Sequence, residues 1–347
     1  MKPPTADAVA DLSLFVAALT QGQTVPSTRF RWAQYVSDLQ AAGISTWEIP
    51  SRCGAYAPAS TIARPLWLGT AVCEGLWRAL RSRVSEVCFL QRNLVATLCT
   101  WEPLLRQPFA FDVDDAIFVG PRGASADRIA RRASVTICGN SFLANHFAVL
   151  GKVEILPTAV DTDRFVPCTP RDGRPVIGWS GSSSGFAYLL DIEPAVQCAL
   201  DRFPDAIIKI VSDRKPDFRT LPGARVVFEP WHPDTEVTSL QSFTVGLMPL
   251  RDTPWARGKC SFKMLTYMAV GVPVVVSPVG MNNEVLAHGA CGYPARTHDE
   301  WVDAISSLIA NPNAAADLGR AGRSIVETQY ARRVIGPRLA QILKGML

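Results

Sequence analysis

Short apolar runs alternate with longer amphipathic stretches along most of the chain. In the first half, the apolar runs predict strands at 12–18, 44–49, 87–91, 109–111, 134–138 and 153–156. The stretches between them have helical spacing, at 28–42, 66–83, 94–100, 125–132 and 141–150. This repeated order of strand and helix predicts a doubly wound parallel α/β domain.

The second half repeats the same organisation. Its predicted strands are 175–179, 206–211, 225–228, 244–248 and 273–277, and its predicted helices are 186–203, 234–242, 261–270, 282–288, 300–310 and 313–328. Residues 166–174 are rich in Pro, Gly and charge without periodicity, which is typical of a linker. We therefore expect an N-terminal domain over 1–165, a linker over 166–174, a C-terminal domain over 175–331 and a terminal helix over 332–347.

The segment 258–284 shows helix, stop, buried strand and loop in unbroken order. Gly271 and Pro273 end the predicted helix, and the valine run that follows fits a strand covered on both faces. Lys259 and Lys263 lie four residues apart near the start of this helix, where free backbone N–H groups attract an anion. We therefore expect a diphosphate there. The competing interpretation is an ordinary αβ unit with two solvated lysines.

Other polar loops follow predicted strands, where open α/β sheets bind their ligands. Small residues after the strand 175–179 can let backbone N–H groups approach a phosphate, although the loop lacks the G-x-G-x-x-G spacing. After the first strand, Thr28, Arg29 and Arg31 lead into a helix, and Arg92 ends the strand 87–91. These residues are candidates for acceptor or phosphate binding, or are helix-cap and surface residues.

The composition of the chain excludes several classes of protein. The 347 residues suffice for two domains, 48% of them are hydrophobic, and the net charge of +4 is too small to indicate a nucleic-acid partner. Nine scattered cysteines without a C-x-x-C pair indicate free thiols in a reducing compartment. No apolar run is long enough to span a membrane. We expect a cytoplasmic protein, and we favour a first core strand over a signal peptide at the amino terminus.

The segment 258–284, with GLMPL before it and LGRAGRSIVETQYA after it, resembles the carboxyl-terminal signature of family 4 (group 1) GT-B glycosyltransferases. The resemblance is strong over about residues 175 to 333. It implies a GT-B fold, in which two Rossmann-like doubly wound domains face a central cleft. It also implies transfer of a sugar from a nucleotide-sugar donor with retention of anomeric configuration, and no metal cofactor.

The resemblance also implies roles for individual residues. It assigns the donor to the second domain, with Ser180, Gly181, Ser182, Ser212, Trp231, Glu236, Lys259, Lys263, Asn282, Asn283 and Glu284 as donor-binding residues. It places the loop with Thr28 and Arg31 at the cleft, and by their positions after predicted strands we add Arg92 and Asn140 as acceptor-binding candidates, with Arg92 alternatively an exposed strand-end charge and Asn140 a helix cap. One departure is clear, because Gly258 and Thr266 stand where the family has paired glutamates.

Three carboxylates, Asp112, Asp114 and Asp115, come directly after the strand 109–111. Such a cluster needs hydroxyls, arginines or a metal to offset its charge. Together with Arg29, we expect these carboxylates to be the catalytic residues that hold the acceptor, because DVDDA resembles the D-x-DDA of some family members. The alternatives are a divalent-metal D-x-D motif, a purely structural cluster, or the first motif of a haloacid-dehalogenase-like phosphatase with Asp112 as nucleophile.

A further amphipathic stretch lies at 66–83, where Leu76, Trp77, Leu80 and Val84 are flanked by Arg78, Arg81 and Arg83. Such a helix can lie on an anionic membrane or receive a lipid-linked acceptor. The interpretation we favour is a helix that faces the core and leaves its arginines in solvent.

The sequence thus predicts a retaining glycosyltransferase that uses a nucleotide-sugar donor and a hydroxyl acceptor, without a metal. A magnesium-dependent phosphatase and a non-catalytic nucleotide-sugar-binding protein remain the alternatives. The nucleotide, the sugar, the acceptor, the oligomeric state and the groups that replace the paired glutamates are left open, and a peripheral contact with the inner face of the membrane is an option.

Overall fold

The computed structural model describes residues 14–22, 25–54, 56–120, 122–168 and 173–347. The chain forms two compact units. Unit 1 contains the described residues up to Ala159 together with Gly258–Cys260 and Arg332–Leu347, and unit 2 contains Val160–Arg257 and Ser261–Ala331. The chain therefore crosses between the units more than once. Residues 169–172 of the predicted linker and residues 12–13 of the first predicted strand lie outside the described residues.

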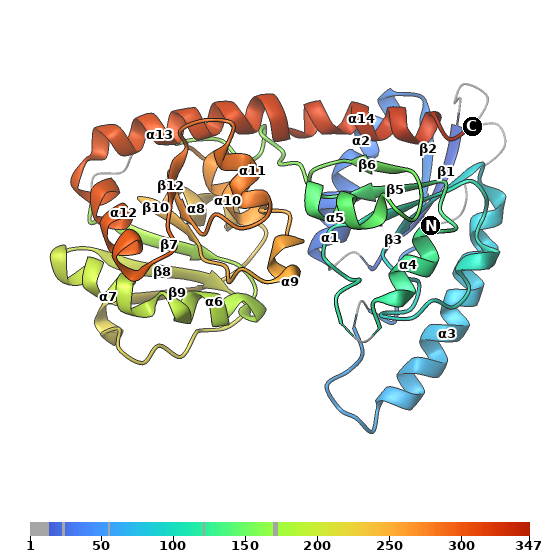
Figure 1. The fold of residues 1–347 in the computed structure, drawn as a ribbon, viewed down its shortest axis with the longest axis horizontal. Helices are drawn as coiled ribbons and strands as arrows, with labels where there is room; N and C mark the ends of the chain where they lie inside the picture. The colour runs from blue at the N-terminus through green and yellow to red at the C-terminus, as the bar shows by residue number, and fades with distance from the viewer. Residues whose placement is uncertain (1–13, 23–24, 55, 121, 169–172) are drawn as a thin grey trace. The chain divides into compact units, whose positions relative to one another are not determined.

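Unit 1 is built on a parallel six-stranded sheet in the order β2-β1-β3-β4-β5-β6 (Figure 1). Its strands are β1 (Leu14–Leu19), β2 (Ile44–Glu48), β3 (Val87–Gln91), β4 (Phe109–Val113), β5 (Val135–Cys138) and β6 (Val153–Ile155). Every residue of β3, β4 and β5 is buried, as expected for central strands covered on both faces. All six strands confirm predicted apolar runs.

Helices cover this sheet. They are α1 (Pro26–Arg31), α2 (Val36–Ala41), α3 (Arg64–Arg81), α4 (Ala124–Ala130), α5 (Ser141–Phe147) and α14 (Arg332–Lys344). The last helix of the chain places Ile335, Leu339 and Leu343 in the hydrophobic core of unit 1. None of the helices that the structure describes is both long enough and apolar enough to cross a bilayer.

Unit 2 has a second parallel six-stranded sheet, in the order β12-β11-β10-β7-β8-β9. Its strands are β7 (Val176–Ser180), β8 (Ile207–Ser212), β9 (Val226–Pro230), β10 (Val245–Met248), β11 (Val274–Val276) and β12 (Gly292–Pro294). The order reverses between β10 and β7, which is where sheets of this type bind ligands at the carboxyl ends of the strands.

Eight helices of unit 2 accompany its sheet in the described part of the chain. They are α6 (Phe186–Asp191), α7 (Glu193–Arg202), α8 (Glu236–Gln241), α9 (Pro254–Arg257), α10 (Phe262–Ala269), α11 (Met281–Leu286), α12 (His298–Ala310) and α13 (Pro312–Ile325). The core on one face joins apolar residues of α7 and α12, such as Val196, Leu200 and Ile305, to the sheet.

Three predicted helices differ from the structure, and two short elements were not predicted. The predicted helix 28–42 is divided into α1 and α2 by the 3-10 turn Ala33–Tyr35. Residues 94–100 are not helical, because Thr97 has a left-handed backbone with φ 64° and Val95 bridges to Leu98 in a turn. The predicted helix 186–203 is two helices, with α7 beginning at Glu193 and a proline in its first turn. The short elements β12 and α9 were not predicted, because three or four residues give too little periodicity to detect.

Candidate functional site

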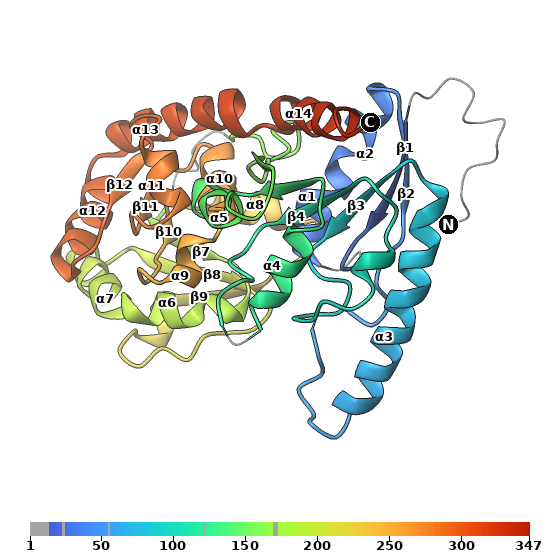
Figure 2. The same cartoon turned by 45° about the vertical axis from the view of Figure 1, so that its right-hand side comes forward.

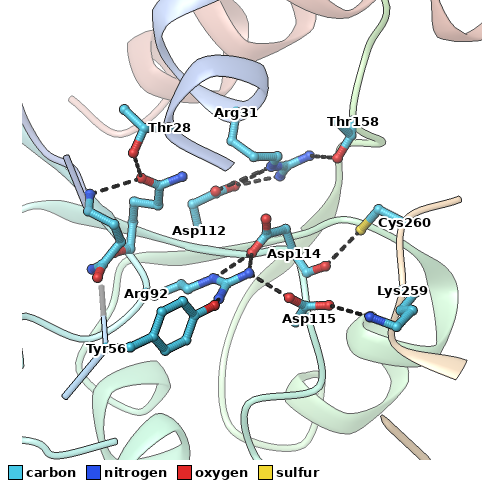
Figure 3. Close-up of polar contacts among 12 residues, drawn as sticks. Thr28, Arg31, Tyr56, Arg92, Asp112, Asp114, Asp115, Thr158, Lys259 and Cys260 are labelled. Atoms are coloured by element: carbon cyan, nitrogen blue, oxygen red, sulfur yellow. Dashed lines mark hydrogen bonds and ion pairs between the residues drawn. The ribbon is translucent and has the colours of Figure 1, made fainter. Parts of the chain in front are cut away.

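In unit 1, the three predicted aspartates divide between two arginines (Figure 3). Asp112 lies in β4 and pairs with Arg31 at the end of α1, with Nη2 and Oδ1 2.5 Å apart. Both side chains are only 1% exposed, and the guanidinium also donates to the carbonyl oxygen of Leu156 at 2.6 Å. The expectation that Asp112 and Arg31 contact an acceptor is therefore wrong: the two residues neutralise each other inside the unit.

The Arg31–Asp112 pair is held as an ion pair. Burial alone would lower the pKa of Arg31, but the adjacent carboxylate outweighs it and raises that pKa. Burial raises the pKa of Asp112, yet the guanidinium contacts both carboxylate oxygens, at 2.5 and 3.2 Å. We therefore treat the pair as ionised at neutral pH.

Asp114 and Asp115, in contrast, share Arg92 at the carboxyl end of β3. The Arg92 guanidinium lies 2.7 Å from Asp114 and 2.6 Å from Asp115, and Lys259 approaches the second oxygen of Asp115 at 3.9 Å (Figure 3). Arg92 adopts a left-handed backbone, with φ 56°, which is a strained conformation for a residue with a side chain. These four side chains are partly exposed, so they form the accessible charged cluster of unit 1.

The two carboxyl groups of this cluster have opposite pKa shifts. Burial, the largest effect, raises the pKa of Asp115, and the Asp114 carboxylate raises it further. For Asp114, the attraction to Arg92 and Arg31 outweighs burial and lowers the pKa. The proton that this cluster accepts most readily therefore belongs to Asp115.

These shifts predict opposite effects of two isosteric substitutions at pH 7. Asp114→Asn is expected to lower the free energy of unfolding by about 2 kcal/mol, because it removes a charged partner of Arg92. Asp115→Asn is expected to leave the free energy unchanged or to raise it, because a raised pKa in the folded state costs stability at neutral pH. Urea unfolding measures both, and an Asp115→Asn loss as large as that of Asp114→Asn contradicts the assignment. The ionised Asp114 carboxylate adds to the free energy of unfolding above the unfolded pKa of about 3.9. This contribution is lost as the pH falls through the lower pKa of the folded state.

The other acceptor-binding candidates make contacts within unit 1. The Thr28 hydroxyl is buried and donates to Gln91 at 2.9 Å, so a role in acceptor binding is not supported. Asn140 caps α5 by accepting from the N–H of Leu143 at 2.9 Å, and its Nδ2 donates to the carbonyl oxygen of Lys259 at 3.1 Å. Arg29 is partly exposed and stacks on the Phe30 ring, 4.3 Å from its centroid.

The segment Gly258–Cys260 belongs to unit 1 and explains one departure from the family pattern. A Cβ on Gly258 would lie 2.6 Å from the Cβ and 2.7 Å from the backbone nitrogen of Ala116. Cys260 donates from Sγ to the carbonyl oxygen of Asp114 at 3.1 Å, against the open face of Gly139. A glutamate cannot be accommodated at position 258 without displacing this segment.

Two alternatives for the aspartate cluster lose support. Among the described residues, no group of three or more His, Cys, Asp or Glu side chains is arranged to hold a metal ion. Asp112 cannot act as a phosphatase nucleophile in this arrangement, because its carboxylate is buried and bonded to Arg31.

In unit 2, Lys263 covers the small-residue loop that follows β7. A Cβ on Gly181 would overlap the Cε of Lys263 and lie 3.0 Å from its ammonium nitrogen. The same nitrogen lies 5.5 Å from the centre of the Trp179 ring. Gly181 has φ 158° and leaves the space that the lysine occupies. The loop containing Ser180, Gly181 and Ser182 and the Lys263 ammonium group are therefore brought together, as predicted.

The expected pairing of Lys259 with Lys263 on one helix is wrong. The helix α10 begins at Phe262, and the residue before it, Ser261, has a left-handed backbone with φ 50°. Lys259 therefore precedes the helix, and its ammonium group faces Asp115 in unit 1. Lys263, in the first turn of α10, is the lysine that remains at the glycine-serine loop.

Asp213, which sequence reasoning did not select, fixes this loop. Its carboxylate accepts from the backbone N–H of Ser183 at 2.6 Å and from the Ser183 hydroxyl at 2.7 Å. These hydrogen bonds outweigh partial burial and lower the pKa of Asp213. The signal in the sequence was its position next to Ser212, at the carboxyl end of β8.

Trp231 and Glu236 lie beside the end of the same strand. The backbone N–H of Trp231 donates to the carbonyl oxygen of Ser212 at 2.9 Å, and its indole N–H donates to Glu236 at 3.3 Å. Trp231 is 37% exposed and is the candidate to stack on a planar ligand. Glu236 is largely buried and also pairs with Arg164 at 3.0 Å.

In the loop after β11, not all of the residues predicted to bind the donor are accessible to a ligand. Asn282 is fully buried, accepts from the Ser261 hydroxyl at 2.7 Å and donates to the carbonyl oxygen of Ser277 at 2.9 Å, so it supports the loop and is not available to a sugar. Asn283 is exposed. Glu284 lies near Tyr330, whose pKa is raised by burial and further by that carboxylate. Thr266 donates its hydroxyl to the backbone of Lys263 at 2.9 Å.

A cavity of about 500 Å³ also lies in unit 2, next to the ends of β10, β11 and β12. Ser277, Pro278 and Val279 form one wall, and Arg251 in another wall pairs with Asp191 at 2.6 Å. None of the predicted donor residues lines it. The chemistry argued for unit 2 therefore does not depend on this cavity.

Comparison with known proteins supports the GT-B assignment. Residues 174–311 match the family "Glycosyl transferases group 1". A GDP-mannose-dependent alpha-(1-6)-phosphatidylinositol monomannoside mannosyltransferase of Mycolicibacterium smegmatis is 31% identical over 232 residues, which is 59% of this chain and 59% of the relative. Enzymes of the same description from Mycobacterium tuberculosis are 25% identical over 243 residues. The chain therefore spans 59% of the length of the curated relatives that it matches.

Solved structures match nearly the whole chain. A sucrose-phosphate synthase from Thermosynechococcus elongatus aligns with a TM-score of 0.73 at 15% identity, over 96% of this chain and 99% of that one. Anabaena HepE in complex with UDP-glucose aligns with a TM-score of 0.69 at 14% identity, over 96% of this chain and 100% of that one. At these identities the likeness shows the fold alone. The chain thus has the GT-B fold of these solved structures, and residues 174–311, in its second unit, match the group 1 glycosyl transferases.

Proposed function

We propose that this chain transfers a sugar from a nucleotide-diphosphate sugar to a hydroxyl acceptor, with retention of anomeric configuration and without a metal ion. The observation that carries the proposal is the Lys263 ammonium group against the Gly181 loop, at the carboxyl end of β7. A cation in the first turn of a helix, beside a loop at the carboxyl end of a parallel strand, is an arrangement that can bind a diphosphate. The family match covers this same unit.

In the proposed reaction, the bond between the sugar C1 and the diphosphate oxygen breaks, and a bond from C1 to the acceptor oxygen forms. The acceptor proton passes to the leaving diphosphate oxygen, so no protein base is required. Lys263 stabilises the negative charge that develops on the leaving group. Asp213 acts as a positioning residue, because it fixes Ser183 and with it the loop that lies under the lysine.

The partly exposed cluster of Arg92, Asp114 and Asp115 is the proposed acceptor site in unit 1. Carboxylates accept hydrogen bonds from sugar or other hydroxyls, and the Arg92 guanidinium donates to an acceptor oxygen. This revises the sequence-based set, which also included Asp112, Arg31, Thr28 and Asn140. The family 4 assignment and a cytoplasmic location, with contact at the inner face of a membrane, belong to the same proposal.

The relatives suggest the first donor and acceptor to test. The mycobacterial enzymes are described as GDP-mannose-dependent and as acting on a phosphatidylinositol mannoside, which is a lipid. We therefore propose GDP-mannose as the first donor and a lipid-linked hydroxyl as the first acceptor class, with UDP-glucose as the second donor.

The test measures release of nucleoside diphosphate by the purified full chain from GDP-mannose, UDP-glucose, dTDP-glucose and ADP-glucose, in EDTA. We expect release from one donor, a rise in melting temperature with that donor, and an α-linked product by NMR. Hydrolysis of p-nitrophenyl phosphate that requires magnesium would favour the phosphatase instead. A melting-temperature shift without turnover, in the presence of lipid and simple-sugar acceptors, would favour the non-catalytic binding protein.

A further inference from the structure

The helix α3 presents its apolar side chains to solvent, which reverses the sequence-based interpretation. Trp77, Leu80 and Val84 are 46%, 48% and 59% exposed, and Leu66, earlier on the same helix, is 76% exposed. Leu66, Trp77 and Leu80 share one face of α3, and Val84, at the end of the 3-10 turn Ser82–Val84 that follows α3, continues the same spacing. We call this set the α3 stripe.

The opposite face of α3 anchors the helix with small residues and one arginine. Ala71, Gly75, Arg78 and Ala79 are the buried residues of the helix. A Cβ on Gly75 would contact the Trp101 ring at 3.4 Å, so the helix approaches its neighbours closely there. Arg78 donates to the carbonyl oxygen of Thr20 at 2.6 Å and to that of Ile49 at 3.1 Å, and burial lowers its pKa to about 10. The sequence favoured a solvated Arg78, and this expectation is wrong.

Packing inside unit 1 is therefore satisfied without the α3 stripe. Figures 1 and 2 show α3 at the periphery of unit 1, with the segment before the helix extending beyond the sheet. Ile62, in that segment, is 91% exposed and adds a further apolar side chain. Several large apolar side chains gathered on one exposed face are unusual for a soluble surface and indicate a contact with an apolar partner.

Most of the charges along α3 and the turn that follows it are positive, with Glu74 and Glu86 as the acidic residues. Arg81 and Arg83 flank its carboxyl end, and Arg64 is exposed at its amino end. Glu74, the one acidic residue in the α3 sequence, accepts instead from the backbone of Arg52 and Cys53, at 2.8 and 3.1 Å. The Arg81 guanidinium lies between two tryptophans, 4.9 Å from the Trp47 ring centre and 5.3 Å from that of Trp77.

We propose that the α3 stripe lies on a phospholipid bilayer that carries anionic headgroups. An apolar face with a tryptophan and a rim of arginines matches the acyl boundary and the negative headgroup layer together. A second copy of this chain fits less well, because paired α3 helices would bring like-charged arginines together, whereas helix pairs are selected by opposite charges at their flanks. This inference rests on the proposed membrane contact and names the surface that makes it.

Co-sedimentation with vesicles tests the proposal on the full chain. We expect sedimentation with vesicles of phosphatidylcholine and phosphatidylglycerol at 7:3, and little with phosphatidylcholine alone. The double variant Leu66→Ser and Trp77→Ser is expected to reduce the partition coefficient at least tenfold, since it removes two large apolar groups from the contact. Arg83→Glu is expected to reduce it more than fivefold, because about fivefold is the effect of one cation at an anionic surface.

Val149→Ser is the matched control, because Val149 is 82% exposed in unit 1 and lies outside the α3 stripe. Leu80→Ser repeats the test at a third position, and melting temperatures show whether each variant remains folded. Equal binding of the double variant and the control, or no binding to either vesicle, overturns the proposal. A dimer in light scattering that dissociates in the double variant, without vesicle binding, also overturns it in favour of a second copy.

The same variants separate this surface from the enzymatic proposal. Nucleotide-sugar binding is expected to be unchanged in the double variant, because its substitutions lie on exposed positions of α3 in unit 1, whereas Lys263 and the Gly181 loop are in unit 2. Vesicle binding without any nucleotide-sugar binding would refute the proposed function and leave the α3 stripe intact as a membrane surface.

Discussion

Lys263→Ala is expected to weaken binding of the nucleoside diphosphate about 100-fold. The ammonium group lies directly over the Gly181 loop, so its removal takes away the cation that would share the charge of the two phosphates. A charge-assisted contact of this kind contributes about 2 to 3 kcal/mol, which corresponds to roughly 30- to 150-fold in affinity. Isothermal titration with the free nucleoside diphosphate measures the change without requiring turnover.

Two controls separate this effect from a general loss of charge or fold. Arg202→Ala removes another cation from unit 2, one that is 52% exposed and pairs with Asp303, and it is expected to leave affinity unchanged. Gly181→Ala keeps Lys263 but places a methyl group where the lysine side chain lies, so it is expected to weaken binding as well. Gly223→Ala is the matched control for Gly181→Ala, because a Cβ on Gly223 meets open space.

Equal nucleotide binding by two variants would contradict the proposed donor site. If Lys263→Ala and Arg202→Ala bind the nucleotide equally well, the diphosphate does not lie at the Gly181 loop. If Gly181→Ala binds normally while Lys263→Ala does not, the lysine is needed but its position over the loop is not.

The positions of the loop residues in the second unit were predictable, because they follow the order of the strands along the chain. The loop at 180–182 directly follows β7, Ser212 ends β8, and Trp231 follows β9. The carboxyl ends of neighbouring parallel strands lie at one edge, so residues at strand ends converge once the parallel fold is recognised. Lys263 was identified for the same reason, as it starts the helix before β11.

The acceptor half was predicted less well, because sequence does not show which charged residue is buried. Asp112, Asp114 and Asp115 are almost adjacent, but Asp112 lies within β4 and pairs with Arg31 inside the unit, while the two later carboxylates follow the strand and pair with Arg92. The left-handed backbone of Arg92 and of Ser261 is also invisible in a pattern of apolar and polar residues. Ser261 ends the possibility of one continuous helix through Lys259.

For the helix α3, the sequence also failed to predict which side chains are buried. Its amphipathic pattern was correct, but which face is buried was not, because small residues and Arg78 pack inward and the large apolar residues point outward. Hydrophobic periodicity reports that a helix has two faces. It does not report that a buried arginine can bond two strand-end carbonyl groups and so make the polar face the packed one.

Arg31→Met is expected to lower the free energy of unfolding by about 3 to 5 kcal/mol, because it leaves the Asp112 carboxylate buried without its partner. Urea unfolding at pH 7 measures the loss. The exposed pair of Arg202 and Asp303 gives the matched control, and Arg202→Met is expected to cost less than about 1 kcal/mol. Equal losses in the two variants would show that the Arg31 pair is not buried as described.

The double variant Arg31→Met and Asp112→Leu separates the pair from its packing. If the loss in Arg31→Met comes from an uncompensated charge, removing the carboxylate as well restores most of the stability, since apolar side chains can replace a buried ion pair at little cost. Urea unfolding of Arg31→Met at several pH values tests the same explanation independently. Burial raises the pKa of Asp112, so in Arg31→Met the folded state binds a proton more tightly than the unfolded chain does, and the deficit shrinks as pH falls through that raised pKa towards the unfolded value of about 3.9. A deficit that stays constant or grows over this range would mean that the lost stability comes from the cavity left by the guanidinium and not from the charge of Asp112.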